Sequence, residues 1–153
     1  LVDVWVHIDK SEHQLVLYSG NKPVKRYRAG FGDPVGDKVQ QGDRKTPEGT
    51  FRVVTRNPKS RFHLFLGLSY PSAEDAARGL EAGLVTSSQA ARIREADKAK
   101  RQPPWNTTLG GAIGIHGEGG SSDWTLGCVA VDNDEIEELW GVVPMGTKVV
   151  VVP

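Results

Sequence analysis

Hydrophobic and polar residues alternate at the start of the chain, as they do in a strand with one buried face. The even-numbered positions from 2 to 8 are apolar and most positions between them are polar, which predicts a strand over 1–8. Segments 14–19 and 24–29 flank the turn-prone sequence Gly-Asn-Lys-Pro and are expected to pair as a hairpin. The chain therefore opens as a β-meander.

The middle of the chain changes from a loop to helices. Residues 30–49 are rich in Gly, Pro, Asp and Lys without a helical period, so they predict a long ordered connection to a strand at 50–56. Connections of this length are usually functional. From Ser72 onward, a capping pattern and Ala-rich sequence predict two short helices, which end before two prolines and form a helical insertion at about 72–102.

The last part returns to strands. The apolar segments 111–116 (GAIGIH) and 128–131 (CVAV) are typical of short buried strands. Asp132 or Asn133 is suited to cap a helix, and a final strand is predicted over 147–152. We expect one domain over 1–153, mainly β with a small α-helical insertion, an α+β fold.

Charge and composition exclude several classes of protein. The 153 residues carry 19 basic and 19 acidic side chains, so no net positive charge attracts nucleic acid or an anionic membrane. The longest purely apolar run, Val149 to Val152, is far too short to span a bilayer. The chain starts without an initiator Met, so we expect a processed product whose targeting segment has been removed.

The single cysteine and one of the four histidines are the candidates for chemistry. Cys128 starts one apolar segment and His116 ends another, so adjacent strands would bring the two side chains together. The imidazole would then take the thiol proton and form a thiolate–imidazolium pair. Without further context, the alternative is a buried structural cysteine and a hydrogen-bonded core histidine.

Two distant motifs provide that context. The segment from Asn106 to Trp140 contains Ile-His-Gly at 115–117 and Asp-Trp-Thr-x-Gly-Cys at 123–128, with the histidine before the cysteine. Upstream, GDRKTPEGTF at 42–51 fits the pattern G-D-x-x-T-P-x-G-x-[FY]. Together they resemble L,D-transpeptidases of the YkuD type, which are cell-wall enzymes with a cysteine nucleophile. The resemblance implies a YkuD-type mixed β-sandwich.

The resemblance implies a role for each residue of the dyad and its surroundings. Cys128 corresponds to the nucleophile, His116 to its general base, and Gly117 to the residue whose carbonyl orients the imidazole. The amides of Gly127 and Cys128 correspond to the oxyanion-hole donors.

The same resemblance implies that Asp123, Trp124 and Thr125 shape the substrate site. From its position at the entrance to the insertion, Tyr70 is expected to act as a hinge or an aromatic wall. The basic residues of the insertion are by default a solvated helix face, with a lid over the cleft as the alternative. Turn chemistry accounts for the Gly, Pro and Asp of the 42–49 segment, and a substrate-facing loop is the alternative there.

The sequence departs from the common family pattern beside the nucleophile. Leu126 stands where most members carry histidine, and Ala130 stands where they carry Arg or Asn. The chain is thus closer to a D-W-T-x-G-C-x-A branch, in which the dyad is retained and the contacts to the acceptor differ.

The resemblance implies a reaction without a metal or an organic cofactor. The donor would be a peptidoglycan stem tetrapeptide that releases D-Ala, and the acceptor would be the amine of a second stem, giving a 3-3 cross-link, or of a wall-anchored protein. An L,D-carboxypeptidase or amidase with the same dyad is the alternative, and a non-catalytic wall-binding module is the second one. The family implies a periplasmic or cell-wall location and sensitivity to carbapenems.

Overall fold

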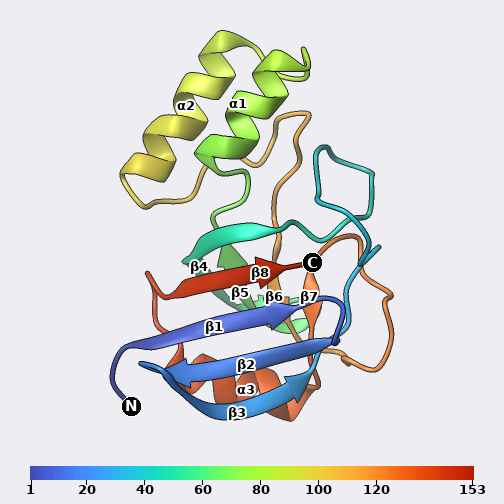
Figure 1. Ribbon diagram of the computed structural model, residues 1–153, viewed down its shortest axis with the longest axis vertical. Coiled ribbons are helices and arrows are strands. Elements are labelled where there is room, and N and C mark those ends of the chain that lie inside the picture. Colours follow the sequence, from blue (N-terminus) through green and yellow to red (C-terminus); the bar gives the residue numbers. More distant parts are fainter.

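Eight strands form one mixed sheet in the computed structural model, which describes all residues from 1 to 153 (Figure 1). The β1–β8 and β6–β7 pairs are parallel and the other neighbours are antiparallel. In order across the sheet, the strands are β3 (Lys22–Arg28), β2 (Gln14–Ser19), β1 (Val4–Asp9), β8 (Lys148–Val152), β4 (Gly49–Ser60), β5 (His63–Leu68), β6 (Gly114–His116) and β7 (Val129–Ala130).

The predicted strands are present, and one strand was not anticipated. The meander, the strand after the long loop and the closing strand all occur, with boundaries within a few residues of those expected. No element was predicted over residues 57–71, but β4 runs on to Ser60 and the chain turns back into β5. His63–Leu68 is apolar at almost every position, because β5 lies inside the sheet between β4 and β6, and it therefore lacks the alternation that marks a half-exposed strand.

The sheet curls around one hydrophobic core. The long strand β4 pairs with β8 through its first residues and with β5 through the rest, and its pairing with β5 contains two register shifts. Side chains from both halves of the sheet, such as Ile8 and Ile115, belong to the same buried cluster of 21 residues. The expected mixed β-sheet architecture is therefore confirmed.

The helical insertion forms a separate unit above the sheet. Helices α1 (Ala73–Glu81) and α2 (Ser87–Lys98) pack against each other at one end of the molecule (Figure 1). The predicted N-cap Ser72 is confirmed, with a capping box to Asp75. A small cluster of five buried residues, which includes Leu109 from the chain that leaves the insertion, holds the pair together.

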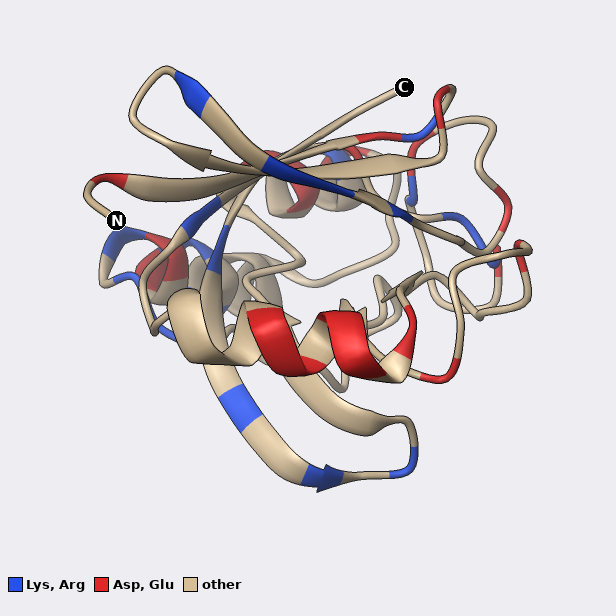
Figure 2. Ribbon diagram, turned by 90° about the horizontal axis from the view of Figure 1, so that it is seen from below, with Lys and Arg blue, Asp and Glu red and all other residues tan.

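Helix α3 (Asn133–Val142) lies at the opposite end and covers the sheet with its apolar side (Figure 1). Asp132 is its N-cap, as predicted, and Ile136 and Leu139 are buried in the main core. Acidic residues recur along α3 (Figure 2), and one of them, Glu138, pairs with Lys25 of β3. No helix of the chain has the length and apolar character needed to cross a bilayer.

Candidate active site

Strand register brings the histidine and the cysteine to one face of the sheet. In the parallel β6–β7 pair, Ile115 lies beside Val129 and His116 lies beside Ala130. One residue earlier on each strand, the same register places Cys128 beside Gly114. Side chains two residues apart on a strand share a face. His116 and Cys128 therefore point to the same side, and both line one cleft.

His116 is held as a neutral imidazole. Its Nδ1 donates to the carbonyl oxygen of Gly117 at 2.8 Å, which leaves Nε2 as the acceptor nitrogen. The ring is 1% exposed, stacks on Phe62 with centroids 4.5 Å apart, and lies 5.6 Å from the ring of Trp124. Burial lowers the pKa of His116 and outweighs the opposing effects of the Gly117 carbonyl and Glu118.

Burial favours the neutral thiol form of Cys128. Its Sγ donates to the carbonyl oxygen of Ala112 at 3.4 Å, not to the imidazole. Burial raises the pKa of the thiol to about 11, opposed by the Gly114 amide and by the charge of Lys38. Burial therefore disfavours the charged form of both groups, and the thiolate–imidazolium pair stays a prediction.

The loop before the nucleophile is fixed by hydrogen bonds of Thr125. Its hydroxyl donates to the Cys128 carbonyl at 2.7 Å and accepts from the Gly127 amide at 3.1 Å. Gly127 has φ +139°, and a Cβ there would lie 2.9 Å from the Lys45 carbonyl oxygen, so only glycine fits.

These contacts change the predicted oxyanion donors. The buried Gly127 amide already has Thr125 as its partner, which contradicts its assignment as an oxyanion donor. The Cys128 amide has no hydrogen-bond partner within the protein. It is the donor of this loop that remains available to a developing negative charge.

Asp123 has a structural position rather than a place in the cleft. Its Oδ1 accepts from the Phe31 amide at 2.9 Å, and its Oδ2 lies 2.8 Å from Nε2 of His13. Asp123 does not line the cleft, whereas Trp124 and Thr125 do. The predicted substrate contact at Asp123 is therefore not supported, because its oxygens tie the nucleophile loop to Phe31, after β3, and to His13, in the turn between β1 and β2.

The structure also contradicts the role predicted for Tyr70. Its side chain is 0% exposed, contacts Phe51 in the core and donates from its hydroxyl to the Leu109 carbonyl at 2.8 Å. Burial raises the pKa of the phenol, with a further contribution from Asp75. Tyr70 thus anchors the insertion from inside the core and cannot touch a substrate in the cleft.

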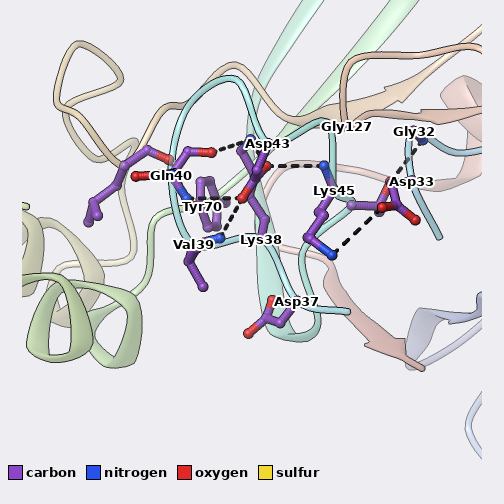
Figure 3. Close-up of polar contacts among 12 residues, drawn as sticks. Gly32, Asp33, Asp37, Lys38, Val39, Gln40, Asp43, Lys45, Tyr70 and Gly127 are labelled. Atoms are coloured by element: carbon purple, nitrogen blue, oxygen red, sulfur yellow. Dashed lines mark hydrogen bonds and ion pairs between the residues drawn. The ribbon is translucent and has the colours of Figure 1, made fainter. Parts of the chain in front are cut away.

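The upstream loop forms the facing side of the cleft, and Asp43 organises it (Figure 3). The carboxylate accepts from the amides of Val39, Gln40 and Lys45 and from Nζ of Lys38 at 3.0 Å. Burial alone would favour the neutral acid, but these donors prevail and lower the pKa of Asp43. Turn chemistry explains Asp43, as expected, while its neighbours Gly42 and Arg44 face the cleft.

The cleft has a volume of about 580 Å³ and is lined by 15 residues. We call residues 112–116 and 124–128 the dyad wall, and residues 38–44 the loop wall. No residue of 72–102 lines the cleft, so the insertion is not a lid over it. Leu126 is 73% exposed at the edge of the cleft. The lining residues are Lys38, Gln41, Gly42, Arg44, Phe62, Trp105, Gly110, Gly111, Ala112, Ile113, His116, Trp124, Thr125, Leu126 and Cys128.

Among the cleft residues that sequence reasoning missed are two cations and two aromatic residues. Lys38 and Arg44 lie in the long loop over 30–49. The length of that loop was the one sequence signal that its residues could belong to a functional site. Trp105 follows the Pro-Pro pair that ends the insertion, and an aromatic residue after a helix carries no sign of where it packs. Phe62 lies in the turn between β4 and β5, to which the sequence analysis gave no role.

Comparisons with known proteins agree with the fold and identify the family. The family model of the L,D-transpeptidase catalytic domain, YkuD, matches residues 3–151. A curated relative of Escherichia coli (strain K12), "Putative L,D-transpeptidase YafK", is 35% identical over 88 residues. That alignment covers 51% of this chain and 35% of YafK, so it spans about a third of the relative's length.

Solved structures show the same fold. The helical cell shape determining protein Pgp2 from Campylobacter jejuni superposes with a TM-score of 0.65 at 23% identity, covering 97% of this chain and 46% of Pgp2. Bd1075 from Bdellovibrio bacteriovorus superposes with a TM-score of 0.65 at 22% identity, covering 99% of this chain and 48% of Bd1075. At these identities the likeness extends to the fold alone.

Proposed function

Because the chain belongs to the L,D-transpeptidase catalytic-domain family of the YkuD type, we propose that its cleft performs cysteine-dependent acyl transfer on peptidoglycan stem peptides. The observation that carries this proposal is the pairing of β6 with β7, which sets Cys128 and His116 on one face of the cleft. The Gly117 carbonyl fixes the imidazole tautomer in which Nε2 can accept a proton.

The reaction follows from the arrangement of the dyad. Cys128 Sγ attacks the carbonyl carbon at the L-centre of the diamino acid while its proton moves to Nε2 of His116. The Cys128 amide stabilises the oxyanion that forms. The C–N bond to D-Ala then breaks, the imidazolium returns the proton to the departing amine, and a thioester remains on Cys128.

The second half of the reaction transfers the acyl group to an amine. His116 removes a proton from the amine of a second stem or of a wall-anchored protein, and that nitrogen displaces Sγ. The product is a 3-3 cross-link or a protein attached to the wall. We propose that the domain acts in the periplasm or cell wall, where stem peptides are found.

Hydrolysis is a second candidate, and the lining of the cleft favours it. None of the 15 lining residues is an Asp or Glu. An approaching ammonium group therefore finds no carboxylate partner in the cleft, and the exposed Leu126 offers no hydrogen bond. Water as the acceptor needs neither a carboxylate partner nor that hydrogen bond. With water as the acceptor, the same dyad would act as an L,D-carboxypeptidase or amidase.

One incubation separates the two reactions. The protein is mixed with labelled stem tetrapeptide, with and without an acceptor amine, and products are followed by mass spectrometry. Accumulation of cross-linked dimer supports transfer, and accumulation of free tripeptide supports hydrolysis. If neither forms, and if a carbapenem leaves no covalent adduct on Cys128, the chain is a non-catalytic wall-binding module.

A further inference from the structure

Charge in the cleft has one sign. Lys38 and Arg44 are the only charged side chains among the 15 lining residues, although acidic and basic residues are equal in number over the whole chain. Both cations belong to the loop wall, across the cleft from the nucleophile. A cleft of this kind attracts an anionic group of a ligand.

Lys38 is a fixed and largely buried cation. Its Nζ donates to the Asp43 carboxylate at 3.0 Å and to the Gln40 carbonyl oxygen at 3.1 Å. An ammonium group has three N–H donors, so one remains. Lys38 is close enough to the nucleophile for its charge to lower the pKa of Cys128. Its charge is partly offset by Asp43.

Arg44 is the unpaired cation. Its exposed guanidinium forms no ion pair or hydrogen bond within the protein. Its backbone, in contrast, is fixed: φ is +62°, and its carbonyl oxygen accepts from the Asp33 amide. A Cβ at position 32 would lie 2.0 Å from that carbonyl oxygen, so Gly32 is needed for the approach.

The loop that carries Arg44 is held at both ends. Asp43 binds three backbone amides on one side. On the other side, the buried Nζ of Lys10 donates to the Thr46 carbonyl at 2.8 Å and lies 2.9 Å from the Glu48 carboxylate. A rigid loop that presents an unpaired guanidinium lowers the entropic cost of binding an anion.

We propose that Arg44, supported by Lys38, forms a carboxylate-binding subsite that orients the donor peptide against Cys128. The identity of the ligand as a stem peptide rests on the proposed function, while the anion preference of the cleft does not. A guanidinium binds a carboxylate through two parallel hydrogen bonds, which fix orientation as well as position. The carboxylate is either that of the terminal D-Ala or the free one of the diamino acid.

The first test needs no enzymatic activity. Cys128 is alkylated with iodoacetate, which is anionic, and with iodoacetamide, which is neutral and of nearly the same shape. In Arg44→Gln, the ratio of the iodoacetate rate to the iodoacetamide rate should fall roughly threefold, as expected for losing one partly screened charge from the cleft that the thiol lines. Arg44→Lys should keep the wild-type ratio, and so should Arg92→Gln on the insertion.

The second test uses peptides. For stem tetrapeptide, Arg44→Gln should lower kcat/KM about 10-fold or more, as expected for loss of a charge-assisted hydrogen bond. Three donors are compared: the free acid, its D-Ala amide, and the amide at the diamino acid carboxylate. The Arg44 effect should vanish for one of the two amides, which identifies the carboxylate that Arg44 binds.

The outcomes separate this proposal from the proposed function. An unchanged alkylation ratio in Arg44→Gln overturns the subsite, whatever the enzymatic activity. An equal loss of kcat/KM for all three donors also overturns it, because it indicates a role without carboxylate recognition. A lowered alkylation ratio in a protein that turns over no stem peptide keeps the subsite and refutes the stem peptide as its ligand.

Discussion

The ionisation of side chains is controlled differently on the two walls of the cleft. On the dyad wall, burial disfavours charge: it raises the pKa of Cys128 and lowers that of His116. On the loop wall, hydrogen bonds preserve charge: Asp43 stays ionised, although burial opposes it, because backbone amides and Lys38 donate to it. The comparison teaches that burial alone does not decide ionisation, and that available donors do.

Replacing the nucleophile is expected to have the largest effect on the dyad wall. Cys128→Ala should abolish turnover and any carbapenem adduct, because no other thiol exists in the chain. Stability should change by no more than about 1 kcal/mol, since the thiol makes one weak hydrogen bond. Product formation by mass spectrometry and the urea midpoint test both statements. Residual turnover in a cysteine-free preparation would refute the nucleophile assignment.

Removing the base is the next largest change. His116→Ala should lower kcat/KM by roughly 10²- to 10⁴-fold, the range typical of a general base. It should also slow alkylation of Cys128 by iodoacetamide near neutral pH, because nothing then takes up the thiol proton. As a control, His63→Ala alters an exposed histidine paired with Glu137 and should leave both rates unchanged. Equal alkylation rates in wild type and His116→Ala would contradict the dyad.

The loop wall is tested through its central acid. Asp43→Asn should destabilise the fold by about 3 kcal/mol, because Lys38 is left with a buried and unpaired charge. Asp33→Asn is the matched control: its carboxylate is 46% exposed and 3.6 Å from Lys45, so about 0.5 kcal/mol is expected. Urea denaturation measures both.

The pH dependence of the free energy of unfolding tests whether Asp43 is ionised in the folded protein. The pKa of Asp43 is lower in the folded state than in the unfolded one, so its stabilisation is complete above about pH 4, the ordinary Asp pKa. It is lost as the pH falls through the folded value. Between pH 5 and pH 3 the wild type should therefore lose more stability than Asp43→Asn. Parallel curves for the two proteins would show that Asp43 is not held as the charged form.

The smallest expected effect concerns the resting charge of the dyad. Without the base, in His116→Ala, a thiol whose pKa is raised to about 11 should be alkylated by iodoacetamide about tenfold faster per pH unit from pH 6 to 9, without a plateau. In the wild type, proton transfer to His116 should instead make the rate nearly independent of pH over the upper part of that range. Initial rates in a set of buffers at constant ionic strength distinguish the two.

The sequence alone determined the types of element and the candidate dyad. Alternation found the meander, the Ser72 and Asp132 caps located two helix starts, and two ordered motifs identified His116 and Cys128. These are local signals, because a capping residue or a period-two pattern acts within a few residues of itself. The order of the two motifs along the chain can likewise be read from the sequence without knowledge of the fold.

The tertiary structure decided everything that depends on distant neighbours. Only packing shows that Tyr70 points into the core, that Asp123 bonds to the Phe31 amide, and that the insertion lies away from the cleft. Ionisation belongs to the same class, because desolvation and hydrogen-bond donors come from segments far apart in sequence. The shifted pKa values of the dyad and the cationic loop wall are thus properties of the folded chain, which no local pattern encodes.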